Sequence, residues 1–233
     1  MDGPSVSVIV PTLDEASGIA QTLAALRRQT EPVLELIIAD GGSTDGTADV
    51  ARPLADRVIA AQRGRARQMS SGASVAAGDV LWFVHADTVP GEGAVAAIRA
   101  AVRGGRCWGR LRSRLDGRRW PFRVIERFIH WRALATGIST GDQTLFVTRD
   151  AFERVGGFPD LPLMEDLAIT RALRRIQWPA ACPVNATTSS RRWERDGIWR
   201  TVRLMWWLRL AFWLGADPVR LARRYGRGGN GAA

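Results

Sequence analysis

The chain has 233 residues, a hydrophobic share of 46% and a formal net charge of +10, which suits a packed globular protein attracted to phosphates, anionic lipids or acidic substrates. Its two cysteines are too few for a disulfide framework or a four-ligand zinc site. No apolar stretch approaches the roughly 20 residues that cross a bilayer, and no secretory signal is visible, so we expect a cytoplasmic protein.

Strands and helices alternate along the first 105 residues. Short apolar runs predict buried strands, and amphipathic segments between them predict helices. The predicted strands cover residues 6–10, 34–39, 58–60 and 80–84, and the predicted helices cover residues 15–28, 44–55, 67–77 and 93–102. This alternation is typical of α/β proteins with a mostly parallel sheet and helices on both faces.

The pattern changes after residue 105, where residues 106–140 become rich in arginine and aromatic side chains. A strand is predicted at residues 144–147, and helices are predicted at residues 121–135, 150–155 and 167–175, followed by a helical tail at 198–214 and 218–225. No repeat or low-complexity linker interrupts the chain, so we expect one domain covering residues 1–233.

Two predicted strands end in a carboxylate. Asp40 follows one strand and is succeeded by two glycines, and Asp87 follows another. In open α/β sheets, ligands bind beyond the carboxyl ends of the strands. A carboxylate such as Asp87 can hold a divalent cation and, through it, a diphosphate. Asp40 can accept hydrogen bonds from a nucleobase or ribose, with Gly41 allowing close approach. The two strand ends therefore predict a nucleotide site.

Further candidate groups each have a plain structural alternative. Asp14 and Glu15 are either caps of the first helix or ligand contacts. Residues 63–68 place guanidinium groups against a diphosphate, or form a solvated basic turn. Residues 141–143 are a loop turn, or touch metal, diphosphate or acceptor. Residues 164–166 are partners of a helix dipole, or include a general base that deprotonates an attacking hydroxyl.

In their order and spacing, these motifs resemble the family-2 glycosyltransferases of the GT-A fold. The matching segments are residues 8–15, 37–47, 78–87, 156–158 and 165–166, within a stretch of about residues 5–180. The resemblance implies an α/β fold of GT-A type, a mostly parallel mixed sheet flanked by helices with a helical C-terminal tail. Residues 5–105 would form the nucleotide-binding half, residues 106–183 the acceptor half and residues 184–233 the helical tail.

The resemblance also implies roles for individual residues. Asp87 would bind Mg²⁺ or Mn²⁺, and Asp166 would be the catalytic base, with Glu165 beside it at the acceptor. The residues assigned to the donor are Pro11, Thr12, Glu15, Asp40, Gly41, Arg65, Gln68, Asp142, Gln143, Arg192 and Trp193. The expected reaction is an inverting, metal-dependent transfer from a nucleotide diphosphate sugar, with a UDP-sugar favoured, to a hydroxyl of a glycan, lipid or small molecule.

Two positions depart from the family pattern. Asp14 stands where the family has Asn, and His85 stands at the first position of the Asp-x-Asp motif, which leaves Asp87 as the firm metal ligand. A narrower resemblance is to a small bacterial subgroup associated with radical-SAM genes, some of whose members are labelled arsenosugar-biosynthesis glycosyltransferases. It rests on residues 64–66, 68–69, 85–88, 141–143 and 162–166.

Two other function classes remain open. Residues 199–214 combine Trp, Leu and Arg as an interfacial helix does, so one alternative is a non-catalytic module that binds nucleic acid or the inner face of a membrane. The structural alternative is a helix that covers the sheet or forms a dimer seam. No nucleic-acid reader motif occurs, so no specific nucleic acid is expected. A nucleotidyltransferase ranks low, because residues 11–20 lack a glycine-rich loop with a basic end. The oligomeric state is left open.

Overall fold

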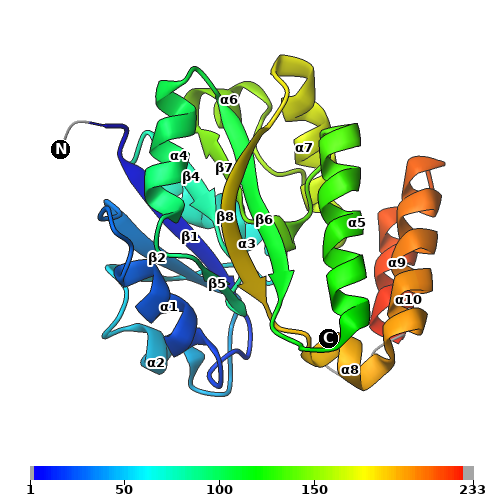
Figure 1. The fold of residues 1–233 in the computed structure, drawn as a ribbon. Coiled ribbons are helices and arrows are strands. Elements are labelled where there is room, and N and C mark those ends of the chain that lie inside the picture. Colours follow the sequence, from blue (N-terminus) through cyan, green and yellow to red (C-terminus); the bar gives the residue numbers. More distant parts are fainter. Residues whose placement is uncertain (1–2, 228–233) are drawn as a thin grey trace.

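The computed structural model describes residues 3–227, apart from the side chains of residues 192, 226 and 227. The described chain forms three layers, with a mixed sheet between two layers of helices (Figure 1). The strands are β1 Val6–Thr12, β2 Glu35–Asp40, β3 Arg57–Ala60, β4 Val80–Phe83, β5 Thr88–Pro90, β6 Trp108–Leu115, β7 Leu145–Thr148 and β8 Ala180–Thr188. Their order across the sheet is β3-β2-β1-β4-β7-β6-β8-β5.

The sheet joins a parallel half to a mixed half. β3, β2, β1 and β4 pair in parallel, β7 is antiparallel to both β4 and β6, and β8 pairs parallel with β6 and antiparallel with β5. The chain leaves β1 toward β2 on one side and later returns as β4 on the other, so the carboxyl end of β1 lies at a topological switch point. The predicted α/β fold with a mixed, mostly parallel sheet is confirmed.

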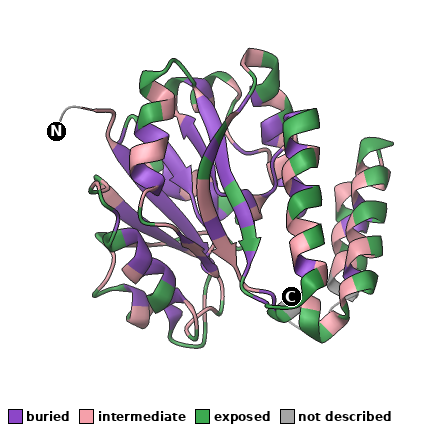
Figure 2. Ribbon diagram, in the orientation of Figure 1, coloured by how far each residue is buried: buried purple, intermediate pink, exposed green. Residues whose placement is uncertain are grey.

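Each face of the sheet packs on its own helices. Along β1, successive side chains point to opposite faces. Val8 and Val10 join a core with α1 (Ile19–Arg27) and α4 (Ala94–Arg103), whereas Ile9 joins a core with α3 (Arg65–Val75) and α7 (Glu165–Ile176). The central strands β1, β2, β4 and β7 are the most buried part of the molecule, whereas β3 and β8 are more exposed (Figure 2). The helices in these layers are α1 Ile19–Arg27, α2 Thr47–Ala51, α3 Arg65–Val75, α4 Ala94–Arg103, α6 Arg149–Arg154 and α7 Glu165–Ile176.

The helical tail closes one end of the molecule. α5 Trp120–Thr136 packs on β6, and beyond it lie α8 Arg191–Asp196, α9 Ile198–Trp213 and α10 Pro218–Arg227 (Figure 1). Leu208 of α9 and Leu221 of α10 are buried with Leu163 and Met164, the two residues before α7. The tail therefore packs on the loop that starts α7. Within residues 3–227, no helix combines the length and the apolar character that a membrane span needs.

Three strands were not predicted. β5, β6 and β8 all lie in the mixed half of the sheet. In β6, Leu111, Ser113 and Leu115 are buried while the arginines between them are exposed, a two-residue period that the arginine content obscured. α1 also begins later than predicted, at Ile19, because residues 15–18 form a turn closed by the N–H groups of Gly18 and Ile19 on the Glu15 carbonyl.

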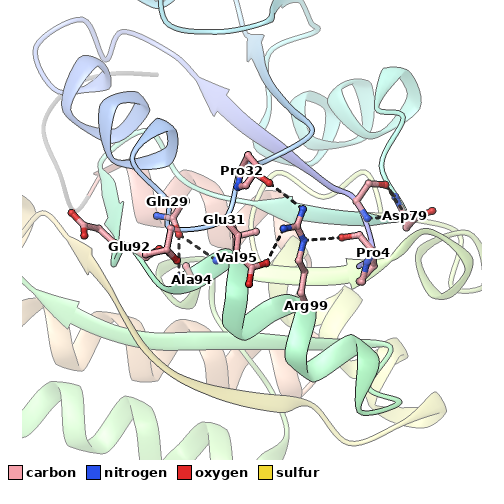
Figure 3. A network of polar contacts seen from close by, with 11 residues as sticks. Pro4, Gln29, Glu31, Pro32, Asp79, Glu92, Ala94, Val95 and Arg99 are labelled. Atoms are coloured by element: carbon pink, nitrogen blue, oxygen red, sulfur yellow. Dashed lines mark hydrogen bonds and ion pairs between the residues drawn. The ribbon is translucent and has the colours of Figure 1, made fainter. Parts of the chain in front are cut away.

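A buried arginine ties the layers together at the edge where β1 begins. Arg99 of α4 is 7% exposed, pairs with Glu31 at 2.7 Å and donates to the carbonyls of Pro4 and Pro32 (Figure 3). Nearby, the Gln29 amide oxygen accepts the first N–H groups of α4, from Ala94 and Val95 (Figure 3). A side chain from outside the helix thereby caps α4.

Arg99→Ala is expected to lower the free energy of unfolding by about 2–3 kcal/mol, because hydrogen bonds to a charged group are lost and partners are left unpaired. Urea unfolding at neutral pH measures this loss. Arg103→Ala, at an exposed position of the same helix, is the matched control and should change stability by less than about 0.5 kcal/mol. Equal losses in the two variants would contradict a structural role for the Arg99 contacts.

Candidate functional site

The carboxyl ends of β1 and β4 open into a pocket of about 670 Å³, here called the central pocket. Its walls come from the segment after β1, the start of α3, the β4–β5 loop, the 3-10 turn Gly141–Gln143, the loop before α7, and the helical tail. Nine of the predicted site residues line it: Pro11, Thr12, Glu15, Arg65, Gln68, Asp87, Asp142, Asp166 and Trp193. Residues far apart in sequence thus meet at the switch point.

Two loops are joined beside the pocket. Asp14 accepts a hydrogen bond from the Thr44 N–H at 2.8 Å, and its own N–H donates to the Ser43 hydroxyl at 3.0 Å. The N–H of Glu15 donates to the Thr47 hydroxyl at 2.8 Å. Asp14 is therefore no helix cap. These reciprocal bonds fix the segment after β1 against the segment after β2, and so fix where the Glu15 side chain stands.

Asp40 and Gly41 lie beside the central pocket and do not line it. The Asp40 carboxylate accepts hydrogen bonds from the N–H groups of Gly42 and Ser43 and from the hydroxyls of Thr12 and Ser43. Its oxygens hold their own turn together, and the contact with a nucleobase stays a prediction. A Cβ on Gly41 would stand 3.0 Å from the Gln68 side chain, so the glycine admits that side chain.

Gln68 connects α3 to two strand ends. Its amide nitrogen donates to the Thr12 carbonyl at 2.7 Å and to the Ala39 carbonyl at 2.9 Å, and the side chain is 3% exposed. Both amide hydrogens are thereby used by the protein. Gln68 lines the pocket as part of its floor.

Two carboxylates, those of Glu15 and Asp87, repel each other in the pocket. Burial, followed by the charge of Asp87, raises the pKa of Glu15 to about 7. Among residues 3–227, no three His, Cys, Asp or Glu side chains group to form a metal cage. Mg²⁺ is commonly held by one or two carboxylates together with substrate phosphates. Asp87 fits that arrangement, since a cation beside it would offset the repulsion that the two acids show.

The carboxylate of Asp166 is held in a fixed orientation. One oxygen accepts the Gly141 N–H and the other the Leu167 N–H, each at 2.8 Å.

The His85 ring lies against Gly141. A Cβ at Gly141 would stand 2.2 Å from the Cε1 atom of His85, so only glycine fits beside the ring. Burial and then the charge of Arg65 lower the pKa of His85, so the imidazole is neutral at physiological pH. The bond from the Gly141 N–H to Asp166 joins the 3-10 turn to the start of α7, so that Asp142 and Asp166 line the same pocket.

Glu165 and Gln143 lie outside the pocket wall. Glu165 is 2% exposed and pairs with the Arg65 Nε at 3.0 Å. Burial raises the pKa of Glu165 and the nearby Arg65 opposes that shift. The structure therefore sets Glu165 behind Arg65 and outside the wall of the central pocket, and its place beside the acceptor stays a prediction. Gln143 is fully buried and its side chain closes a capping box with Thr140. The side chain of Arg192 lies outside the described residues.

The sequence did not indicate every wall of the pocket. Met205 and Arg209 of α9 and Tyr225 of α10 also line it. They reach the pocket only because the tail packs on Leu163 and Met164, and no local motif marks that contact. Arg63, Arg65 and Arg209 face the same space as the carboxylates, so the pocket can take a cation and a polyphosphate together.

The raised pKa of Glu15 gives a pH prediction for the metal-free protein. A raised folded-state pKa means that the folded state holds the proton more tightly than the unfolded chain, so stability falls as pH rises from about 4.5 to about 7. Because Glu15 is partly exposed, screening reduces the effect to on the order of 1 kcal/mol. Glu15→Gln removes this titration, so the variant should be more stable than the wild type at pH 8 and equally stable at pH 4. Urea unfolding with EDTA at both pH values tests this, and an equal difference at both would refute it.

Comparison with known proteins identifies relatives. The model of Glycosyl transferase family 2 matches residues 7–156. The PGL/p-HBAD biosynthesis glycosyltransferase of Mycobacterium tuberculosis (strain ATCC 25177 / H37Ra) is 37% identical over 94 residues, which cover 37% of each chain. The chain therefore matches well under half the length of this relative.

Two solved structures share the fold. The mannosyltransferase PcManGT from Pyrobaculum calidifontis, in complex with GDP-Man and Mn²⁺, superposes with a TM-score of 0.69 at 23% identity over 97% of this chain and 70% of its own. Glucosyl-3-phosphoglycerate synthase from Mycobacterium tuberculosis, with Mn²⁺, UDP and glucosyl-3-phosphoglycerate, gives 0.58 at 20% identity over 80% of this chain and 71% of its own. These likenesses show the GT-A type of fold.

Proposed function

Because the chain belongs to glycosyl transferase family 2, we propose that it transfers a sugar from a nucleoside diphosphate sugar to an acceptor hydroxyl with inversion at the anomeric carbon. The observation that supports this most strongly is the central pocket, where Asp87 and Asp166, from separate segments, line one cavity with three arginines. Family membership favours this enzyme over a non-catalytic binding module and over a nucleotidyltransferase.

The donor would lie across the switch point. Pro11, Thr12 and Glu15 would line its nucleoside end, and the guanidinium groups of Arg63 and Arg65 would neutralise its diphosphate. In this proposal Asp40, Gly41 and Gln68 act indirectly, by holding the strand ends in place. Glu165 acts as a positioning residue, because its ion pair fixes Arg65. Asp142 and Trp193 stand at the acceptor side of the donor, and Gln143 supports them from behind.

A divalent cation would be held by Asp87 together with oxygens of the donor. Mg²⁺ or Mn²⁺ there would supply charge neutralisation for the leaving diphosphate. Burial raises the pKa of Glu15 most, and the negative charge of Asp87 raises it further; this second contribution supports a cation at this place. Both similar structures described above contain Mn²⁺, which is consistent with the same requirement here.

Asp166 would take the proton of the acceptor hydroxyl. As the acceptor oxygen forms its bond to the anomeric carbon, the bond from that carbon to the diphosphate oxygen breaks, and its electron pair leaves with the diphosphate. The proton moves to Asp166, whose two oxygens are already oriented by backbone N–H groups. One base and one displacement invert the configuration at the carbon. A positioned base of this kind contributes about 10²–10⁴-fold in rate.

A panel of nucleoside diphosphate sugars with Mn²⁺ tests the proposal by thermal shift. A ligand at a hundred times its Kd adds about 2.7 kcal/mol to the free energy of unfolding, so the correct base and sugar should stand out. We expect a UDP-sugar to respond, with GDP-mannose as the main competitor, since similar structures hold UDP in one case and GDP-Man in the other. A panel in which no nucleotide raises Tm would contradict the proposal.

The narrower arsenosugar resemblance and the membrane contact of residues 199–214 stay predictions.

A further inference from the structure

We infer that the acceptor is an amphiphile whose single apolar chain lies in a groove between α5 and α9, an inference that rests on the proposed function. This apolar groove holds about 280 Å³. Its facing walls are Val124, Ile125 and Phe128 of α5 and Val202, Met205 and Trp206 of α9. The two helices run side by side (Figure 1), and the rings of Phe128 and Trp206 stack with centroids 5.0 Å apart.

The apolar groove adjoins the central pocket. Asp142, Thr188, Trp193, Met205 and Arg209 line both spaces. A molecule extending from one into the other would place a polar head near Asp142 and Asp166 and an apolar chain between the helices. At roughly 30 Å³ for a water-sized group, the groove has room for on the order of ten such groups. That size suits part of one hydrocarbon chain and is too small for a folded polypeptide element.

The walls of the groove remain accessible in the folded chain. Val124 is 51% exposed, Phe128 43% and Trp206 54%. Large apolar side chains with this much accessible surface usually mark a binding site when they form one patch. Here the patch leads into a cavity with a proposed catalytic base, which favours a substrate over an unrelated partner.

The charge on the other face of α9, where it meets α10, agrees with an amphiphile delivered from an anionic surface. Neither α9 (residues 198–213) nor α10 (residues 218–227) contains an acidic residue. Five of their arginines line a hollow of about 780 Å³ next to Trp207: Arg200, Arg203, Arg220, Arg223 and Arg224. Basic and aromatic side chains on neighbouring helices are typical of surfaces that meet lipid headgroups. This is the segment in which the sequence predicts a membrane contact.

Titration calorimetry with n-butyl, n-hexyl and n-octyl β-D-glucopyranoside, each below its micelle concentration, tests the inference. The protein is saturated beforehand with Mn²⁺ and the nucleoside diphosphate found by thermal shift. If each added methylene is buried in the groove, affinity should rise about fourfold per methylene. Trp206→Ala removes one wall and should reduce this dependence on chain length at least by half. Trp213→Ala, on the same helix and 73% exposed outside the groove, is the control and should retain it.

Three results would overturn the inference. Affinity independent of chain length would mean that no apolar chain is buried. If Trp206→Ala and Trp213→Ala reduced the dependence on chain length equally, the alkyl chain would bind exposed tryptophan side chains in general and not the groove. A wild-type dimer that Trp206→Ala dissociates in sedimentation experiments would make the groove a subunit seam. Because nucleotide binding is measured first and separately, a failure of the proposed function appears as missing nucleotide affinity and is distinguishable from all three.

Discussion

Asp166→Asn is expected to lower kcat for sugar transfer by about 10²–10⁴-fold, because asparagine cannot accept the proton of the acceptor hydroxyl. The Kd for the nucleoside diphosphate should stay nearly unchanged, since the arginines and Asp87 that would bind it are untouched. Single-turnover transfer and calorimetry on the same preparation measure the two effects. A loss confined to kcat would separate a base from a residue that binds the donor.

The folded state of this variant needs its own control. The Asp166 carboxylate accepts two N–H groups, and an asparagine side chain has only one acceptor oxygen. One backbone donor is left facing an amide N–H₂ group, at a cost of about 1–3 kcal/mol. Unfolding measurements must therefore show that the variant is folded at the assay temperature. Asp142 lines the same pocket and is the rival base: full activity in Asp166→Asn together with inactivity in Asp142→Asn would transfer the role to Asp142.

The parallel half of the fold could be predicted because its signals are local. β1, β2 and β4 are short apolar runs that are buried on both faces, and helices separate them along the chain. β6 and β8 carry weaker signals. β6 alternates arginine with buried residues, and β8 contains Pro183 and Asn185, which are rare in strands. Their pairing joins segments some 70 residues apart, and such pairing follows from tertiary packing.

The candidate site was predictable where a residue stands at a strand end or a helix start. Asp87 and Asp166 line one pocket as their positions suggested. The orientation of side chains could not be predicted in the same way. Asp40 turns into its own loop and Glu165 turns into the core toward Arg65, and both choices depend on hydrogen-bond partners that only the fold brings near. Arg209 reaches the pocket from a helix that carries no recognisable motif.

Asp87→Ala is expected to abolish the dependence of nucleotide binding on Mn²⁺. A metal contributes several kcal/mol of charge stabilisation to the transfer of such a group, so transfer should fall on the order of 10²–10³-fold. Calorimetry with UDP or GDP, in Mn²⁺ and in EDTA, measures the binding part directly. In the wild type, affinity should be higher with Mn²⁺, and in Asp87→Ala the two conditions should give the same Kd.

Glu15→Gln is the matched control for that experiment, because it also removes one pocket carboxylate while leaving Asp87 in place. It should keep the difference between Mn²⁺ and EDTA. A second readout comes from the coupling between the two acids: since the charge of Asp87 helps to raise the pKa of Glu15, Asp87→Ala should lower that pKa. The loss of stability with rising pH would then be smaller. It would begin at the same pH as in the wild type and be complete at a lower pH. Retained Mn²⁺ dependence in Asp87→Ala would contradict the assignment to Asp87, and its loss in Glu15→Gln at the same time would move the cation to Glu15.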